Sequence, residues 1–475
     1  MRKYLKFYID GQWVDPFELK TVNTVNPATE EVSGTIALGS AADVDKAVTA
    51  ARKAFATWSK SSREDRLKVL ERILVEYQKR SNELAAAVTA EMGAPKGLAG
   101  GFHIGLGAGH LTTAIEILKR FKFEEQRGTT LFVKEPIGVC GMITPWNWPI
   151  NQVTVKVFPA LAAGCTIVLK PSQESHFSAQ ILAEIFDAAA VPAGVFNLIQ
   201  GKGSVVGAAL ATHPDIDMIS ITGSEPAGVE VAKNAASTVK RVCQELGGKS
   251  ANIVLDDTDF AANVAKGVAG MMINSGQTCS ATSRMLVPKA RMSEAISVAH
   301  RSAAAVTVGD PSGDFAMGPV VSKAQFNSVQ KYIQKGIDEG AMLVAGGIGR
   351  PDGLTKGFYV KPTVFANVTN DMVIAREEIF GPVLAIIGYD TVDQAIQIAN
   401  DSEFGLAGNV AGADLDKARA VARQIRAGWV SINDGFDFHA AFGGYKKSGN
   451  GREWGEFGFQ EYLEIKSLLG YAPQT

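Results

Sequence analysis

The spacing of apolar residues predicts an N-terminal region of long helices. In residues 63–80, REDRLKVLERILVEYQKR, apolar side chains recur at helical spacing with charged residues between them. Upstream, YIDGQW has apolar residues on both sides of Asp10-Gly11, a pair that favours a tight hairpin turn. We therefore expect a hairpin followed by amphipathic helices up to about residue 121. The helical stripe comprises Leu67, Leu70, Leu74 and Tyr77.

From about residue 138 to 255, short apolar runs alternate with helix-like segments. The runs are VCGMI, TIVLK, VFNLIQ, MISITG, RVCQEL and ANIVLD. This alternation is typical of βαβ units in a parallel sheet. A second series, from about 283 to 432, contains SRMLVP, GPVLAIIGY and GWVSIN. The pattern predicts an α/β fold with a doubly wound parallel sheet and a second α/β domain.

Two strand-like segments lie outside these series. FEEQRGTTLFVKEPIGV is typical of a β-ribbon that turns at Gly128, and EYLEIKSLLG near the C-terminus is typical of a single strand. Because unpaired strand edges favour association, we expect these strands to pair with each other or with another subunit, in a homodimer or homotetramer. The alternative is that each extends a sheet of its own chain.

Length and charge restrict the possible partners. The 475 residues exceed the size at which a single core stops growing, about 250–300 residues. Apolar residues make up 46% of the chain, and the formal net charge is -2. This charge provides no basic stripe for nucleic acid and no polybasic patch for a membrane. No apolar run approaches the roughly 18 residues of a membrane span.

The four cysteines indicate a reducing compartment. They lie far apart, without a CxxC pair or a histidine spacing that suggests zinc, and the N-terminus lacks the uninterrupted apolar run of a signal peptide. We expect a cytoplasmic protein without a metal site. The cysteines are Cys140, Cys165, Cys243 and Cys279.

Cys279 is a candidate nucleophile. It lies in NSGQTCSATSR, residues 274–284, among small polar neighbours. A thiol free of bulky neighbours is accessible to an electrophile. Most cysteines are buried and inert, however, so an incidental residue in a helix-ending loop remains the alternative.

Polar residues follow several predicted strands, where ligands of parallel sheets bind. Asn147, rigidly placed in TPWNWP, is a candidate oxyanion donor worth about 3 kcal/mol, or it satisfies turn backbone. Glu245 ends an apolar strand, where a raised pKa suits a general base; a salt-bridged structural glutamate is the alternative.

Other strand ends suggest a nucleotide site. Lys170 suits a ribose hydroxyl or a phosphate, and Ser224 is a good N-cap for a helix that would receive a pyrophosphate. GKGSVVG resembles the dinucleotide fingerprint, although its last glycine comes one residue late. In REEIFGPV, Glu378 is suited to a ribose and Phe380 to a planar heterocycle. The glycines of the first motif are Gly201, Gly203 and Gly207.

Taken together, these motifs resemble the aldehyde dehydrogenase superfamily, of the NAD(P)-dependent hydrolytic type. The order PWNWP, KPSQ, GKGSVVG, ITGS, ELGGKS, GQTCS, EEIFGPV, FGGYKKSGNGRE matches it from about residue 5 to 470, and ELGGKS with GQTC is highly specific. The resemblance implies that Cys279 attacks an aldehyde, giving a thiohemiacetal and then a thioester. Asn147 and the Cys279 N–H would hold the oxyanion, and Glu245 would activate the hydrolytic water. By the same resemblance, Lys156 and Glu453 would relay the proton outward.

The resemblance also implies NAD or NADP as cofactor, with NAD favoured. Lys170 and Gln173 would contact the adenosine ribose, Ser224 the pyrophosphate and Glu378 the nicotinamide ribose, with Trp146 and Phe380 flanking the cofactor. Gln173 replaces a carboxylate common in the family, which leaves the preference for NAD over NADP open. The expected contacts are Thr144, Trp146, Lys170, Gln173, Gly203, Gly207, Gly223, Ser224, Glu378 and Phe380.

The substrate does not follow from the resemblance. Ala441 replaces a proline frequent in the family, and the aromatic stretch GFDFHA precedes it. Two alternatives remain open: a semialdehyde dehydrogenase that transfers the acyl group to coenzyme A, and a cofactor-independent cysteine acyltransferase or esterase. Dehydrogenases that transfer the acyl group to coenzyme A typically lack a base at the position of Glu245. A cofactor-independent acyltransferase or esterase needs a Cys–His pair, which no motif in this sequence indicates. The expected substrate walls are Trp148, Phe436, Phe438 and Phe442.

The expected domains follow the same resemblance. Residues 1–121 and 142–247 would bind NAD(P), residues 248–441 would form the catalytic domain, and residues 122–141 and 442–475 would form the oligomerisation ribbon and strand.

Overall fold

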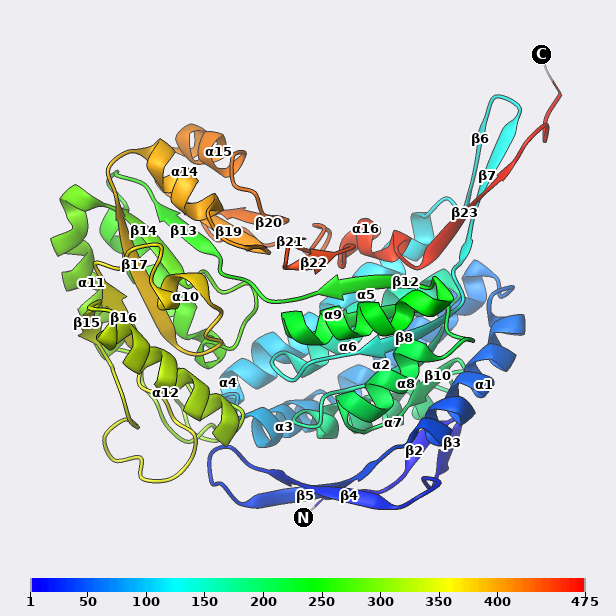
Figure 1. Cartoon of the computed structure of the whole chain (residues 1–475). Helices are drawn as coiled ribbons and strands as arrows, with labels where there is room; N and C mark the ends of the chain where they lie inside the picture. Colours follow the sequence, from blue (N-terminus) through cyan, green and yellow to red (C-terminus); the bar gives the residue numbers. More distant parts are fainter. Residues whose placement is uncertain (1, 474–475) are drawn as a thin grey trace.

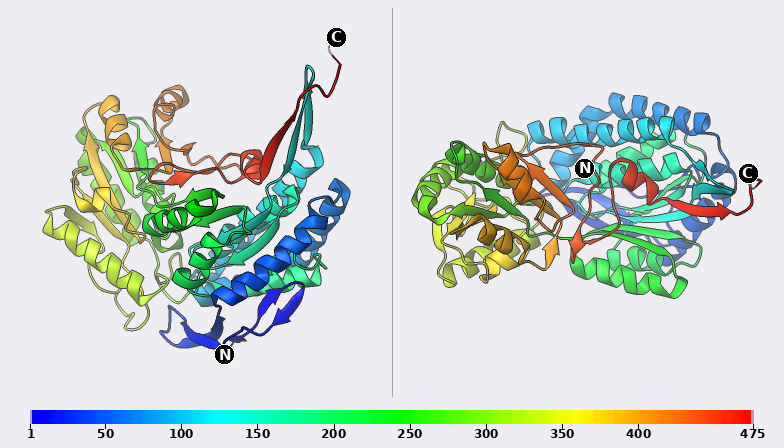
Figure 2. Two further views of the ribbon diagram at one scale, coloured as in Figure 1. Left: turned by 45° about the vertical axis from the view of Figure 1, so that its right-hand side comes forward. Right: turned by 90° about the horizontal axis from the view of Figure 1, so that it is seen from above.

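A computed structural model describes residues 2–473 of the chain. Two sheets with helices packed against them form two bodies, and a narrow three-stranded ribbon projects from one of them (Figure 1). The ribbon also projects from the first body in the left-hand view of Figure 2. The predicted α/β architecture is confirmed.

The first body contains an eight-stranded sheet in the order β22-β12-β11-β8-β9-β10-β2-β3. Its five central strands are parallel, and antiparallel strands close both edges. The predicted Asp10-Gly11 turn joins β2 and β3, with both residues at positive φ. The strands are β2 (Phe7–Ile9), β3 (Gln12–Val14), β8 (Val139–Ile143), β9 (Thr166–Lys170), β10 (Phe196–Leu198), β11 (Met218–Thr222), β12 (Arg241–Glu245) and β22 (Gly449–Asn450).

Helices cover this sheet, which is why every residue of β8, β9 and β11 is buried. The predicted stripe at 63–80 forms α2, which Ser62 caps through its side chain. The helices are α1 (Ala41–Trp58), α2 (Arg63–Lys79), α3 (Ser81–Met92), α4 (Lys96–Leu98), α5 (Ile104–Arg120), α6 (Pro149–Ala163), α7 (His176–Ala188), α8 (Ala208–Thr212) and α9 (Glu225–Ala235).

The second body contains a seven-stranded sheet in the order β15-β16-β17-β14-β13-β19-β20. The run ANIVLD, grouped above with the first series, forms β13 in this sheet, between β14 and β19. Its apolar pattern indicated a buried strand but carried no information on its partners. The strands are β13 (Ala251–Val254), β14 (Arg284–Pro288), β15 (Met342–Ala345), β16 (Thr363–Ala366), β17 (Val383–Tyr389), β19 (Ala407–Ala411) and β20 (Trp429–Ile432). The helices are α10 (Phe260–Met272), α11 (Met292–Ala304), α12 (Lys323–Asp338), α13 (Val373–Arg376), α14 (Val392–Asn400) and α15 (Leu415–Ala422).

The projecting ribbon consists of β6 (Glu124–Arg127), β7 (Thr130–Pro136) and β23 (Leu463–Leu468), which α16 (Gly455–Gln460) precedes. β23 pairs antiparallel with β7, from Leu463 opposite Pro136 to Leu468 opposite Leu131. The expected pairing of the two isolated strand segments with each other is therefore confirmed. Within residues 2–473, the outer edge of β23 has no partner strand.

Two smaller sheets complete the fold. β1 (Arg2–Tyr4), β4 (Lys20–Val25) and β5 (Val32–Leu38) form a three-stranded sheet that the sequence patterns above did not predict. β18 (Phe404–Gly405) pairs with β21 (Tyr445–Lys446) and attaches the C-terminal segment to the second body.

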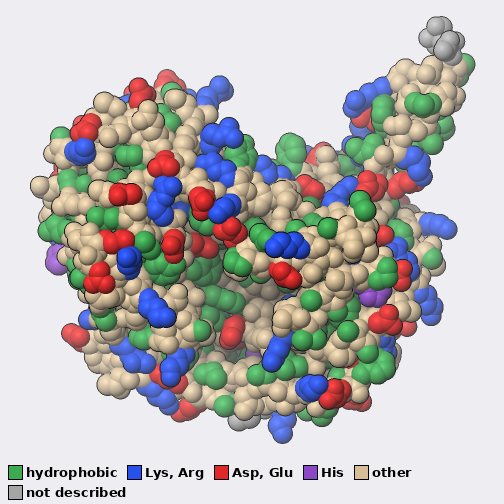
Figure 3. All heavy atoms as spheres, viewed as in Figure 1, with side chains coloured by type: hydrophobic (Ala, Val, Ile, Leu, Met, Phe, Trp, Pro, Cys, Tyr) green, Lys and Arg blue, Asp and Glu red, His purple; other side chains and the backbone are tan. Residues whose placement is uncertain are grey.

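The surface carries both signs of charge interspersed on the face shown in Figure 3. Within the described range of the chain, no helix has the length and apolarity needed to cross a lipid bilayer.

Candidate active site

The candidate nucleophile Cys279 lies on the loop between α10 and β14, with its side chain partly exposed. Burial of the thiol raises its pKa above the ordinary value, and the nearby carboxylates of Glu378 and Glu245 raise it further. The raised pKa favours the protonated thiol over the thiolate. A base has to take its proton before the sulfur attacks.

The candidate oxyanion donor Asn147 follows β8 and is 2% exposed. Its Nδ2 donates to the carbonyl of Gln277 at 3.0 Å, and the adjacent Trp148 Nε1 donates to Thr278 Oγ1 at 2.9 Å. The TPWNWP turn is thus joined to the two residues that precede Cys279.

The candidate base Glu245 ends β12 and is 4% exposed. Neither of its carboxylate oxygens has a hydrogen-bond partner among residues 2–473. Burial raises its pKa well above the ordinary value; the Glu453 carboxylate raises it further, and Lys156 opposes the shift. Among the described residues, Glu245 therefore lacks the ion pair that the structural alternative would require.

The main chain at the two glycines after Glu245 passes close to the Glu378 side chain and to the nucleophile loop. A Cβ at Gly247 would lie 2.4 Å from Glu378 Oε2, and one at Gly248 would lie 2.5 Å from the carbonyl oxygen of Cys279. The turn therefore requires glycine at both positions because of this close approach.

Lys156 and Glu453 form a buried ion pair beside Glu245. Lys156, on α6, is fully buried and also donates to Ser220 Oγ at 3.0 Å. Glu453 comes from the C-terminal segment, 7% exposed. The structure thus brings together all five residues expected to carry the chemistry.

The expected cofactor residues gather at the carboxyl ends of β8, β9 and β11, which are neighbours in the sheet. The Oγ1 atoms of Thr144 and Thr222 are buried there without a partner among the described residues, so they are available to a ligand. Lys170 Nζ donates to the carbonyls of Pro171 at 2.6 Å and Gly201 at 3.3 Å, and burial lowers its pKa to about 8.

The glycine motif and Ser224 provide room for a ligand. A Cβ at Gly203 would meet no atom within 4 Å, and Gly207 packs beside the Lys170 side chain. Ser224 occupies the N-cap position of α9, next to Gly223, but its side chain makes no capping hydrogen bond.

Gln173 is partly exposed, and its backbone carbonyl is hydrogen-bonded to His176 Nδ1 at 2.8 Å. Open space, orphaned hydroxyls and a strand-end lysine together fit a dinucleotide.

Glu378 and Phe380 approach from the second body. Glu378 Oε1 accepts from the Gly248 N–H at 3.1 Å, and burial raises the pKa of this carboxyl to about 7. The Phe380 and Trp146 rings meet edge to face, 5.4 Å between centroids. The expected flanking pair therefore comes from both bodies.

Aromatic rings extend from the nucleophile loop to the surface. Trp148 contacts Phe102 at 5.5 Å between centroids, and Phe102 in turn contacts Phe436 at 6.5 Å. Phe102 and Phe436 are both 49% exposed. Beside them, Trp454 is stacked between Phe438 and Phe442. Sequence reasoning missed Phe102, Trp429 and Trp454, which lie outside the quoted aromatic stretch.

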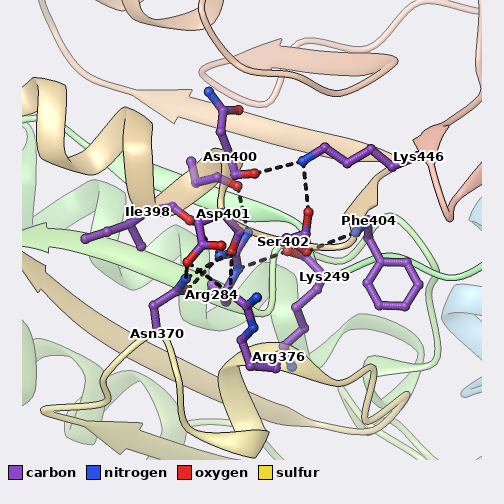
Figure 4. A network of polar contacts seen from close by, with 11 residues as sticks. Lys249, Arg284, Asn370, Arg376, Ile398, Asn400, Asp401, Ser402, Phe404 and Lys446 are labelled. Carbon is purple, nitrogen blue, oxygen red and sulfur yellow. Dashed lines mark hydrogen bonds and ion pairs between the residues drawn. The ribbon is translucent and has the colours of Figure 1, made fainter.

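A network of cationic side chains around the buried Arg284 lies behind the ELGGKS turn (Figure 4). Arg284 is 1% exposed, and its guanidinium donates to the carbonyls of Lys249, Ile398 and Ala399. Lys446 donates to the carbonyls of Asn400 and Ser402. These cations satisfy the final carbonyls of α14 and anchor the turn in the second body.

The comparisons with known proteins agree with this geometry. The model of the aldehyde dehydrogenase family matches residues 13–468. A 3-succinoylsemialdehyde-pyridine dehydrogenase from Pseudomonas sp. is 53% identical over 474 residues, which cover 99% of each chain.

Two solved structures are similar over nearly the whole chain. A mutant of aldehyde dehydrogenase C from Pseudomonas syringae, in complex with NAD+ and octanal, has a TM-score of 0.98 and 53% identity, covering 98% of this chain and 97% of that one. The Mycobacterium tuberculosis aldehyde dehydrogenase in complex with NAD+ has a TM-score of 0.96 and 41% identity, covering 99% of each chain. The chain described here therefore belongs to the aldehyde dehydrogenase family.

Proposed function

We propose that this protein oxidises an apolar aldehyde to the carboxylic acid with NAD, through an acyl-enzyme on Cys279. The observation that carries this proposal is the Glu245 carboxylate, buried without a hydrogen-bond partner among the described residues and electrostatically coupled to the Cys279 thiol. A carboxylate in that setting serves as a base for a thiol or for a water.

The proposed steps use the chain's own groups. Glu245 takes the thiol proton, and the sulfur forms a bond to the aldehyde carbon. The resulting oxyanion accepts hydrogen bonds from the Asn147 amide and the Cys279 N–H. The buried pair of Lys156 and Glu453 would pass the thiol proton outward, which restores the Glu245 carboxylate. After hydride leaves the substrate carbon, Glu245 deprotonates the water that attacks the thioester. The C–S bond then breaks, and Glu245 returns this proton to the sulfur as the acid is released.

NAD, when bound, supplies the hydride acceptor. Thr144, Lys170 and Glu378 would hold its riboses, Gly223 and Ser224 its pyrophosphate, and Trp146 with Phe380 would flank it. The NAD+ complexes of the two solved relatives support this cofactor. The neutral Gln173 provides no charge against a 2′-phosphate, so rates with NAD and NADP measure this preference directly.

The proposed substrate class rests on the aromatic path. Rings from Trp148 to Phe436 favour burial of an apolar tail at about 0.8 kcal/mol per methylene. Two relatives, one solved in complex with octanal and one named for a pyridine-bearing semialdehyde, support an extended or aromatic substrate. Replacement of Phe436 by alanine should lower kcat/KM for octanal about tenfold. The kcat/KM for propanal, whose short chain does not reach Phe436, should stay within about twofold of the parent value. Phe457→Ala, at the 64% exposed Phe457 of α16, is the control.

The central test is Cys279→Ala, assayed for NADH formation and for covalent acyl-enzyme by mass spectrometry. Turnover should fall by more than about 1000-fold and the adduct should disappear. A strict requirement for coenzyme A would indicate the acyl-transferring alternative. Ester hydrolysis without any NADH formation would indicate the cofactor-independent one.

We also propose a cytoplasmic homo-oligomer, dimer or tetramer, with the domain division expected from the sequence. The free state of all four cysteines supports a reducing compartment. The open edge of β23 supports association through the ribbon. The separate sheets support an NAD-binding part at 1–121 and 142–247, a catalytic part at 248–441, and an oligomerisation part at 122–141 and 442–475.

A further inference from the structure

The segment just before Cys279 has an unusual backbone. Asn274 and Ser275 both have φ of 56°, and Gly276 follows at 70°. Three consecutive residues thus have left-handed backbone conformations. Glycine and asparagine adopt this conformation readily, and most other residues do so only at a cost in free energy. At Gly276 a Cβ would lie 2.1 Å from the Gly381 carbonyl oxygen, so the main chain is also tightly confined.

Three buried amides hold this segment against the TPWNWP turn. Asn274 Nδ2 donates to the Asn147 carbonyl at 2.7 Å, and Asn147 Nδ2 donates to the Gln277 carbonyl at 3.0 Å. Gln277 Nε2 then donates to the Asn274 carbonyl at 3.1 Å. The three residues form a closed ring, and each is at most 2% exposed.

This ring contains one of the two proposed oxyanion donors and lies close to the other in the chain. Asn147 is a member of the ring, and Gln277, another member, is two residues before Cys279. Asn147 is held through its backbone carbonyl by Asn274 and through its side chain by Gln277. Asn147 Oδ1 has no partner among the described residues, so no other hydrogen bond fixes the side-chain amide.

We propose that Asn274 is a positioning residue that aims the Asn147 amide and the Cys279 N–H at the oxyanion by joining their two loops. The proposal rests on the function proposed above for Cys279 and Asn147. Asparagine suits the role because it tolerates the left-handed backbone and its amide donates a hydrogen bond to a carbonyl.

The variant Asn274→Gly separates the two properties of asparagine. Glycine adopts φ of 56° without strain but has no amide. We expect kcat with aldehyde and the rate of ester hydrolysis both to fall by about 30-fold or more, with an unchanged KM for NAD and a melting temperature close to that of the parent. Full activity in Asn274→Gly would mean that asparagine serves only the backbone conformation, and would overturn the proposal.

Ser275→Gly is the matched control. Ser275 has the same φ, but its hydroxyl donates a hydrogen bond to the Gly318 carbonyl at 2.9 Å and takes no part in the ring of amides. Activity of this variant should stay within about threefold of the parent. An equal loss of activity in both glycine variants would assign the effect to general loosening of the loop.

A double-mutant cycle with Asn147→Ala distinguishes positioning from a structural role. Because part of the effect of Asn274 passes through the Asn147 amide, Asn274→Gly should lower kcat by a smaller factor in the Asn147→Ala background than in the parent. The loss that remains is the part that acts on the Cys279 N–H. Equal losses in both backgrounds would overturn the proposal. If Cys279→Ala remained active, the proposed function itself would fail, which is a separate result.

Discussion

At the scale of single residues, the site depends on groups whose hydrogen-bonding capacity is left unused. The Glu245 carboxylate and the Oγ1 atoms of Thr144 and Thr222 are buried without partners in the part of the chain that the structure describes. Unpaired buried polar groups cost stability, which favours a role for these groups toward a ligand.

The raised pKa of Glu245 predicts the pH dependence of thioester hydrolysis. A carboxyl with a raised pKa keeps its proton to higher pH than an ordinary glutamate, so its basic form is lost as pH falls through that raised pKa. We expect the deacylation rate, measured as acid released after the first turnover, to rise with pH above the range in which an ordinary glutamate titrates. Glu245→Gln should remove this rise and let the acyl-enzyme accumulate; an unaltered pH profile in that variant would assign the base elsewhere.

Sequence reasoning identified Cys279, Asn147 and Glu245 because each lies in a distinctive motif. It left Asn274 and Gln277 unassigned, although NSG is a turn signal and asparagine with glycine favours the left-handed region. The hydrogen bonds of the amide ring connect residues that are separated by 127 and by 130 positions in the sequence. A local sequence pattern contains no information on contacts between residues so far apart.

At the scale of elements, periodicity predicted the central strands of both sheets but not their partners. β13 directly follows the ELGGKS turn in sequence and yet belongs to the other sheet. The sheet of β1, β4 and β5 went unpredicted, since the six-residue β4 has a single buried residue and so lacks a clear apolar alternation.

The contact of α6 with the C-terminal segment predicts a loss of stability in Lys156→Met. The change leaves the buried Glu453 carboxylate without its cation, which we expect to cost about 3–5 kcal/mol in the free energy of unfolding. Replacing both residues, Lys156→Met with Glu453→Leu, should recover much of this loss. Chemical denaturation measures both changes, and a fully stable single variant would contradict the importance of the pair.

At the scale of the whole molecule, the projecting ribbon of β6, β7 and β23 has apolar side chains exposed beside an open strand edge. On β23, Ile465 is 67% exposed, and Leu469 just beyond it is 82% exposed. Apolar side chains beside an open strand edge favour a partner subunit.

Ile465→Glu should therefore lower the molecular mass measured in solution toward that of one chain. Light scattering after size-exclusion chromatography provides the measurement. Phe17→Glu is the matched control, because Phe17 is similarly exposed, at 69%, and lies outside the ribbon. An unchanged mass for Ile465→Glu would place the association elsewhere.

The C-terminal segment also determines when the first body is complete. Its edge strand β22 pairs with β12, and Phe459, Tyr462 and Leu463 belong to the largest hydrophobic core. A nascent chain that has not yet reached residue 449 has an incomplete core and a bare β12 edge. The first body is therefore completed only after the strands of the second body have been synthesised.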